Sequence, residues 1–179
     1  ELTIKRALHS ASEVCRVENP KVSTLIYPIM QALDEQYLDV DLQYGGMDQR
    51  KILVMAREYL PKLGYKPRVE VMTPLLPGLT GGKMSASDVK SKIDLLDSEK
   101  EIERKVNSAY CKEGEMKDNG VLAFCEYFLF PYKDQLRIER AEKFGGNVNY
   151  DVFNDLKKDF VAKKLHPLDL KQAVSRELN

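Results

Sequence analysis

The sequence predicts an α/β fold in the first half of the chain and an all-helical region after it. Asp39–Tyr44 is a short alternating run that ends at two glycines, and Arg68–Met72 has the pattern of a second strand. Between them, Asp48–Leu60 has the apolar spacing of a helix of about a dozen residues. A strand, a helix and a strand in this order are typical of one half of a parallel α/β sheet.

Further helices are expected on both sides of this unit, because apolar residues recur there at helical spacing. These helices are Leu2–Val17 and Val22–Leu38 before the unit, and Glu99–Ala109, Val121–Leu129, Tyr150–Leu165 and Leu168–Leu178 after it. Strand-like runs are few in the second half of the chain. We therefore place a domain boundary near residues 93–99 and divide the chain into domains 1–95 and 96–179.

Composition excludes several classes of protein. The 179 residues include 28 basic and 28 acidic ones, so any contact with a nucleic acid must come from local patches. No apolar run approaches the roughly 20 residues of a membrane helix, and the N-terminus does not resemble a signal peptide. Cys15, Cys111 and Cys125 are far apart and form no CxxC pair. We expect a reduced, cytoplasmic setting, with no membrane contact, disulfide framework or protein metal site.

A loop rich in hydrogen-bond donors follows the second strand. Two glycines precede Lys83, and hydroxyl groups follow at Ser85 and Ser87. A lysine charge and hydroxyl donors on a flexible loop are what a transferring phosphate requires, because negative charge builds on its oxygens. The structural alternative is that Ser85 or Ser87 caps a helix that begins near Asp88. The residues alone leave both interpretations open.

Two further segments carry polar groups at positions that suit a ligand. Tyr27, Gln31 and Asp34 are spaced so that all three project from one helix face, as the wall of a polar pocket or as a solvated surface. The first strand ends at Gly46 and is followed by Asp48, so a ligand could approach the backbone at this end of the sheet. Here the alternative is a simple turn with Asp48 as a helix cap.

The C-terminal region contains an aromatic residue and a short polar motif of interest. Phe144 precedes two glycines and could fill a core or stack on an unpaired base. His166 and Pro167 begin a new helix, and Asp169 lies in its first turn, where an acid suits the helix dipole. The same carboxylate could accept a hydrogen bond from a base.

These segments resemble the signatures of one family. Lys-Met-Ser-Ala-Ser at 83–87 resembles the signature loop of class I aminoacyl-tRNA synthetases, although Ser87 stands where many members have a second lysine. Tyr-Pro-Ile-Met-Gln-Ala-Leu-Asp at 27–34 and Gly-Gly-Met-Asp-Gln-Arg-Lys at 45–51 resemble the tyrosyl-tRNA synthetases of archaea and eukaryotes. The resemblance covers nearly the whole chain. It implies the second half of a Rossmann-like catalytic domain followed by an all-helical anticodon-binding domain.

The resemblance implies a role for each matching residue in the activation of L-tyrosine by ATP and its ligation to tRNA(Tyr). Lys83 and Ser85 would be catalytic, and Lys83 would steady the ATP phosphates, which carry Mg²⁺. The implied ligands are Tyr27, Gln31, Asp34 and Gln49 for tyrosine, Gly46, Asp48, Lys83, Met84 and Ser85 for ATP, and Arg50, Phe144, His166 and Asp169 for tRNA. Among these, Asp34 would accept a hydrogen bond from the substrate phenol.

One expected signature is absent from the chain. His9 and His166 are its only histidines, and neither lies in the His-x-Gly-His segment that class I enzymes carry. We therefore expect a piece, inactive alone, whose partner is the missing N-terminal half and whose parent is a homodimer or a pseudo-dimer. Two alternatives stay open: a non-catalytic tRNA-binding half of a double-length synthetase, and a tryptophanyl-tRNA synthetase, which also uses Lys-Met-Ser-Ala-Ser.

Overall fold

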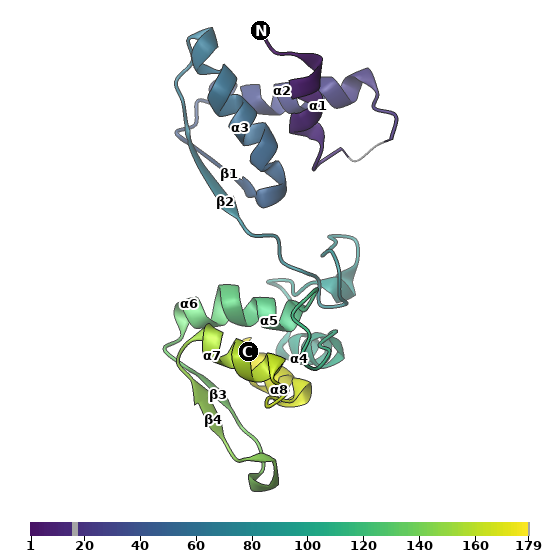
Figure 1. Cartoon of the computed structure of the whole chain (residues 1–179), viewed down its shortest axis with the longest axis vertical. Coiled ribbons are helices and arrows are strands. Elements are labelled where there is room, and N and C mark those ends of the chain that lie inside the picture. The colour runs from purple at the N-terminus through teal and green to yellow at the C-terminus, as the bar shows by residue number, and fades with distance from the viewer. Residues whose placement is uncertain (16–17, 179) are drawn as a thin grey trace. The chain divides into compact units, whose positions relative to one another are not determined.

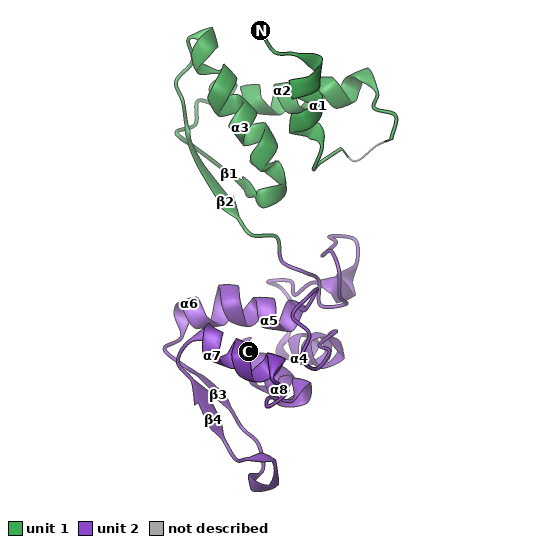
Figure 2. Ribbon diagram, in the orientation of Figure 1, with its two compact units in different colours: residues 1–75 green, residues 76–179 purple. Residues whose placement is uncertain are grey.

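The computed structural model describes residues 1–15 and 18–178. The chain divides into two compact units, residues 1–75 and residues 76–179, which are coloured separately in Figure 2. Each unit has its own hydrophobic core. No helix within the described ranges is long and apolar enough to span a membrane.

The first unit combines three helices with a two-stranded parallel sheet (Figure 1). In chain order its elements are α1 (Ile4–Ala11), α2 (Val22–Tyr37), β1 (Leu42–Gly46), the 3-10 turn η1 (Met47–Gln49), α3 (Arg50–Tyr59), the 3-10 turn η2 (Pro61–Leu63) and β2 (Val69–Thr73). The expected strand–helix–strand order is confirmed. The first helix is shorter than expected and ends at Ala11, while Arg16 and Val17, at the end of the expected helix, lie outside the described residues.

The carboxyl ends of the two strands lie at the same edge of the sheet. β1 and β2 are parallel, and Gly46 at the end of β1 pairs with Thr73 at the end of β2. On one face, Tyr44 and Val71 pair with each other and stay exposed to solvent. The other face lies against η1 and α3, because a β carbon on Gly45 would be 3.4 Å from the side chain of Gln49 in η1 and 3.9 Å from that of Leu53 in α3. The turn that leaves β1 therefore begins at the carboxyl edge of a parallel sheet, where ligands of α/β proteins commonly bind.

The core of the first unit forms where α2 and α3 meet. Ala32 of α2 packs in one cluster with Met55, Ala56 and Leu60 from α3 and its C-terminal end. The partly buried side chains of Leu2, Ile29, Leu33, Tyr59 and Tyr65 surround this cluster. Since α2 and α3 share this core, the polar side chains on α2 are held beside the turn that starts α3.

The second unit is mostly helical. Its elements are η3 (Val89–Ser91, a 3-10 turn), α4 (Glu99–Ser108), α5 (Gly120–Phe124), η4 (Cys125–Leu129, a π-helix), α6 (Phe130–Tyr132), β3 (Leu136–Ile138), η5 (Glu142–Phe144, a 3-10 turn), β4 (Val148–Tyr150), α7 (Phe153–Val161) and α8 (Pro167–Leu178). Its core draws on α4, α5, η4, α7 and α8. The fully buried side chains there include Leu122, Leu156, Phe160, Leu165 and Leu170.

The expectation of an all-helical second region is wrong in one place. β3 and β4 form an antiparallel pair in which Leu136 aligns with Tyr150. Leu136 and Ile138 are buried and the residue between them is exposed, which is the alternation of a half-buried strand. The connecting segment ends in Gly145 and Gly146, both at positive φ. Strands of three residues are too short for an alternating pattern to be recognised in the sequence. Because Tyr150 ends β4, the helix expected to begin at Tyr150 begins only at Phe153.

The compact units meet earlier in the chain than the boundary expected at residues 95 and 96. Leu79 explains the difference, because it is 1% exposed and packs in the core of the second unit. The segment from Leu76 to Ile93 therefore belongs by its packing to the second unit. The division into domains 1–95 and 96–179 remains a functional prediction.

Candidate functional site

A hydrogen bond joins α2 to the turn after β1. Nε2 of Gln31 donates to Oε1 of Gln49 over 3.0 Å, and the pair is partly buried. Oε1 of Gln31 is itself buried, and within the described residues it has no hydrogen-bond partner. A buried carbonyl oxygen without a donor costs free energy unless a ligand supplies one. The carbonyl oxygen of Gln31 is therefore free to accept a hydrogen bond.

The other two polar residues expected on α2 lie on the same side of the helix as Gln31. Tyr27 is 48% exposed and precedes Gln31 by one helical turn, and Asp34 is exposed one turn after it. Of the three, Gln31 is the residue that a hydrogen bond ties to the turn. Tyr27 and Asp34 remain open to solvent in this unit, so both are accessible to a ligand.

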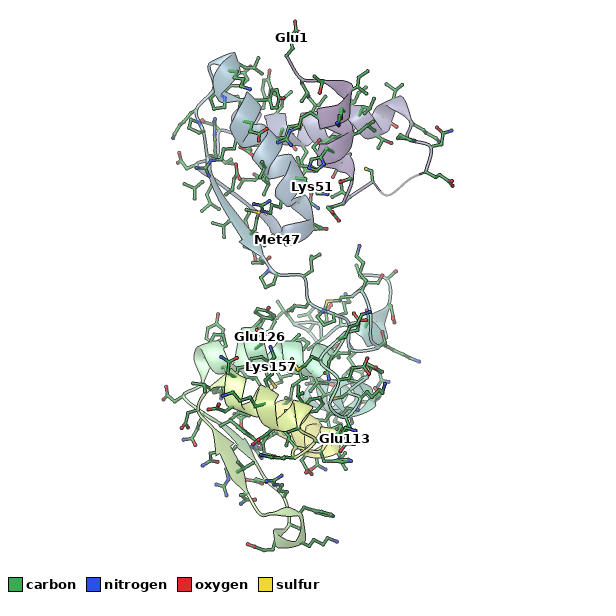
Figure 3. All side chains as sticks on the ribbon, viewed as in Figure 1. Glu1, Met47, Lys51, Glu113, Glu126 and Lys157 are labelled. Atoms are coloured by element: carbon green, nitrogen blue, oxygen red, sulfur yellow. The ribbon has the colours of Figure 1, made fainter. Side chains whose placement is uncertain are left out.

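The turn after β1 is shaped by a close approach of Asp48 to the backbone of Gly46. A β carbon on residue 46 would lie 2.7 Å from Oδ1 of Asp48 and 3.1 Å from Leu75, so a side chain there would displace the carboxylate. Asp48 does not act as the expected helix cap, because Gly46 precedes η1 and Gln49 precedes α3. Arg50 begins α3 with an exposed side chain, close to Met47, which is labelled in Figure 3.

Two buried charged residues, one in α2 and one just before β2, have no signal in the sequence. Glu35 is 1% exposed and Arg68 is 6% exposed. Burial and the nearby carboxylate of Glu70 raise the pKa of Glu35, while Arg68 opposes this shift. Burial also raises the pKa of Glu70, against the charge of Arg57. A glutamate one position after Asp34 gives no sign in the sequence that it is enclosed.

The Lys83–Ser87 loop belongs to the second unit and is closed by a short antiparallel bridge. Pro77 pairs with Lys83, and the amide of Gly78 donates to the carbonyl of Gly82 over 2.8 Å. Lys83 is exposed. The bridge therefore holds the lysine at the base of a loop, with its ammonium group accessible.

The two serine hydroxyls of the loop do not cap a helix. Oγ of Ser85 and Oγ of Ser87 are 3.0 Å apart and hydrogen-bond to each other. Asp88 caps η3 instead, because its Oδ1 accepts from the amide of Lys90 over 3.0 Å. The capping alternative for Ser85 and Ser87 is thus wrong, and their remaining hydrogen-bonding capacity is available to a ligand.

A second candidate site lies in the second unit. A pocket of about 330 Å³ brings together the three residues that sequence resemblance selected, Phe144, His166 and Asp169. It is also lined by Glu113, Arg140, Lys163, Lys164 and Leu168. Glu113 is labelled in Figure 3. Three of the lining residues are basic, which suits a phosphate backbone, and the exposed ring of Phe144 suits a base.

Local contacts orient the groups of this pocket. Nδ1 of His166 accepts from the amide of Leu168 over 3.1 Å, so Nε2 carries the proton of a neutral ring and faces outward as a donor. The side chain of Arg140 donates to the carbonyls of Gly146 and Lys164, over 2.6 and 3.0 Å, and so ties the β3–β4 connection to the segment between α7 and α8. Phe144 is 62% exposed.

Comparison with known proteins gives the family. A family model described as tRNA synthetases class I (W and Y) matches residues 2–179. The chain belongs to this family. It is 52% identical over 169 residues to the cytoplasmic tyrosine–tRNA ligase of Xenopus tropicalis. The aligned residues make up 94% of this chain and 32% of that protein. The chain thus spans about a third of that relative's length.

Solved structures agree with this assignment. Tyrosyl-tRNA synthetase from Archaeoglobus fulgidus, solved with L-tyrosine, matches with a TM-score of 0.83 and 48% identity, over 99% of this chain and 56% of that one. Tryptophanyl-tRNA synthetase from Giardia lamblia matches with a TM-score of 0.59 and 20% identity, over 99% of this chain and 50% of that one. The second likeness shows a shared fold alone.

Proposed function

We propose that the full-length protein containing this chain is a tyrosine–tRNA ligase, which activates L-tyrosine with ATP and transfers it to tRNA(Tyr). The observation that carries this proposal is the contact between Gln31 and Gln49, with the buried carbonyl oxygen of Gln31 left without a donor. An amino acid presents an ammonium group, which supplies such a donor. Membership of the synthetase family supports the same chemistry.

The tyrosine ligands are proposed from their places on α2 and in the turn. Oε1 of Gln31 would accept from the substrate ammonium, with the hydroxyl of Tyr27 as a second partner. Gln49 would hold the amide of Gln31 in this orientation through the bond already present. Asp34 would accept from the substrate phenol, a hydrogen bond that phenylalanine cannot make.

The ATP ligands are proposed in both units. Gly46 lets a ribose approach the backbone, and the carboxylate of Asp48 beside it would accept from a ribose hydroxyl. Lys83, with Met84 and Ser85, would hold the phosphates while the tyrosine carboxylate attacks the α-phosphate in line. This step needs no enzyme nucleophile, because positioning and charge stabilisation lower the barrier. Mg²⁺ would arrive on the ATP phosphates and help to neutralise their charge.

The tRNA ligands are proposed at two places. Arg50, exposed at the start of α3, would contact the acceptor stem. The pocket of Phe144, His166 and Asp169 would hold the first anticodon bases, with the phenyl ring stacking and the polar groups reading base edges. In this proposal residues 96–179 form the anticodon-binding domain, and residues 1–95 belong to the catalytic domain.

The remaining partners follow from the length of the relatives. The chain covers 32% of one tyrosine–tRNA ligase and 53% of another, so we propose that an N-terminal half completes the catalytic domain. The exposed outer face of the sheet, with Tyr44 and Val71, suits such a covering. A homodimer or pseudo-dimer is proposed for the parent protein. A cytoplasmic location is proposed because relatives carry that word in their names.

The experiment that tests the proposal is aminoacylation by the full-length protein with tyrosine and, separately, with tryptophan. Charging of tRNA(Tyr) with tyrosine alone is the expected result. Charging with tryptophan would instead identify a tryptophanyl enzyme. A folded full-length protein that binds tRNA but charges it with neither amino acid would identify a non-catalytic tRNA-binding module.

A further inference from the structure

Ser91 is a buried serine whose side chain contacts the backbone of the Lys83–Ser87 loop. It is 1% exposed and ends η3. Its Oγ accepts from the amide of Ser85 over 3.1 Å. The same Oγ lies 3.1 Å from the carbonyl oxygen of Ser85 and 2.8 Å from that of Asp88. A hydroxyl has one proton, so it donates to one carbonyl at a time while it accepts from the amide.

The backbone of Ser91 contacts the core of the unit. Its carbonyl accepts from the amide of Leu79 over 2.8 Å, and the carbonyl of Leu79 accepts from the amide of Tyr110 over 2.6 Å. Leu79 is itself 1% exposed within the main core cluster. A continuous chain of hydrogen bonds therefore runs from the backbone of Ser85, through Ser91 and Leu79, to Tyr110, two residues after the end of α4.

Ser91 is closely packed against the backbone of the loop and of Gly78. A β carbon on Gly78 would lie 3.2 Å from Cβ of Ser91 and 3.2 Å from Cα of Met84. Gly78 also packs closely against Gly120, because a β carbon on Gly120 would lie 2.9 Å from the carbonyl oxygen of Gly78. The loop thus rests directly on packed backbone, and the Ser91 hydroxyl is the side-chain group that joins the two.

We propose that Ser91 is a positioning residue that latches the Lys83–Ser87 loop to the core of the second unit. This inference rests on the proposed function of the loop. By accepting from the amide of Ser85 and donating to the carbonyl of either Ser85 or Asp88, Ser91 keeps Lys83, Met84 and Ser85 in one arrangement before a nucleotide binds. A preordered loop loses less conformational entropy when it closes on the phosphates, so more of its binding energy is available to the transition state.

The first test measures how often the loop opens, by limited trypsin digestion of the full-length protein. Trypsin cuts after lysine, and Lys83 and Lys90 flank the latched segment. Ser91→Ala removes the hydroxyl alone. Loss of a hydrogen bond of about 1 kcal/mol makes the open loop roughly five-fold more populated, and cleavage after Lys83 and Lys90 accelerates in proportion.

Ser10→Ala provides the matched control. Ser10 is also 1% exposed and also donates to the carbonyl of the residue three positions before it, Ala7, over 2.7 Å. It is a buried residue of α1 in the first unit, whereas the loop belongs to the second unit. The latch is supported if cleavage after Lys83 and Lys90 is faster in Ser91→Ala and unchanged in Ser10→Ala. Equal rates in both variants, or faster cleavage throughout the second unit of Ser91→Ala, overturn it.

The second test separates the latch from the proposed function. In tyrosine-dependent exchange of pyrophosphate into ATP, Ser91→Ala is expected to lower kcat, by at most about five-fold if the whole of the lost hydrogen bond is expressed in the transition state. The KM for tyrosine should stay unchanged, because the proposed tyrosine ligands lie in the first unit. A parallel rise in the KM for tyrosine would overturn the positioning role. Absence of exchange in the wild-type protein would contradict the proposed function instead, and the trypsin result would still decide the latch.

Discussion

Gln31 and Gln49 are joined by a hydrogen bond of 3.0 Å between their side-chain amides, and this bond connects the polar face of α2 to the turn that follows β1. The bond uses the NH₂ group of Gln31 as donor, so its carbonyl oxygen takes no part in it. That oxygen is buried and has no partner within the described residues, so the bond to Gln49 fixes the amide of Gln31 with its oxygen free to accept a hydrogen bond.

Replacement of Gln31 by alanine is expected to weaken tyrosine binding by roughly 10- to 100-fold, because a hydrogen bond to a charged group contributes about 1.5–3 kcal/mol. Isothermal titration of the full-length protein with tyrosine measures this change. Gln36→Ala, on the same helix, is the control and should leave the affinity unchanged. Equal affinity in Gln31→Ala and the wild type would contradict the proposed ammonium site.

Asp34 is expected to determine the choice between tyrosine and phenylalanine. In Asp34→Ala the ratio of kcat/KM for tyrosine to that for phenylalanine should fall at least about ten-fold, because the phenol loses its charged acceptor. Pyrophosphate exchange with each amino acid measures the ratio. Asp39→Asn changes an exposed carboxylate just after the same helix and should not alter the ratio. A ratio unchanged in Asp34→Ala would assign phenol recognition to another residue.

Phe144 is expected to contribute to tRNA binding and not to amino acid activation. Phe144→Ala should raise the KM for tRNA roughly ten-fold or more, since stacking of an aromatic side chain on a base contributes about 1–3 kcal/mol. Pyrophosphate exchange without tRNA should be unchanged. Tyr132→Ala is the control, because Tyr132 is an aromatic residue with 83% exposure that does not line the pocket. An equal effect of both variants would argue against a specific base contact.

Glu35 is expected to make the stability of the first unit depend on pH. Burial and the nearby Glu70 raise its pKa above the ordinary value of 4.5, with Arg68 opposing. A carboxyl group with a raised pKa in the folded state binds its proton more tightly there. Its contribution to stability is therefore complete below about pH 4.5 and is lost as the pH rises through the folded-state pKa.

The measurement is the melting temperature of the full-length protein between pH 4.5 and 8. Glu35→Gln should make the fall of Tm with rising pH shallower, because a neutral amide replaces the buried carboxyl group. Glu103→Gln changes an exposed glutamate on α4 and should keep the wild-type slope. Identical slopes in Glu35→Gln and the wild type would show that Glu35 does not set the dependence.

The parts of the fold that the sequence predicted are those with a strong local signal. The helix at α3 shows its apolar spacing over several turns, and the glycines at 45 and 46 mark where β1 ends. The three-residue strands β3 and β4 have too few positions for a period of two to be recognised, and their pairing depends on residues far apart in the chain.

The candidate site was predicted through its motifs, whereas its contacts were not. The spacing of Tyr27, Gln31 and Asp34 placed them on one helix face, but the bond from Gln31 to Gln49 depends on how closely α2 packs against α3. The burial of Glu35 and of Ser91 is likewise a result of tertiary packing. A serine six positions after Ser85 has no local pattern that distinguishes a latch from a surface residue.

Tyrosine-dependent exchange of pyrophosphate into ATP tests the proposed activation of tyrosine most directly. The assay compares the full-length protein with Lys83→Ala and with Lys90→Ala, which removes an exposed lysine of the same segment. We predict exchange that requires tyrosine, falls about 100-fold or more in Lys83→Ala and is retained in Lys90→Ala, because Lys83 supplies charge to the transferring phosphate. No exchange from the folded wild-type protein, or equal exchange in Lys83→Ala, would contradict the account.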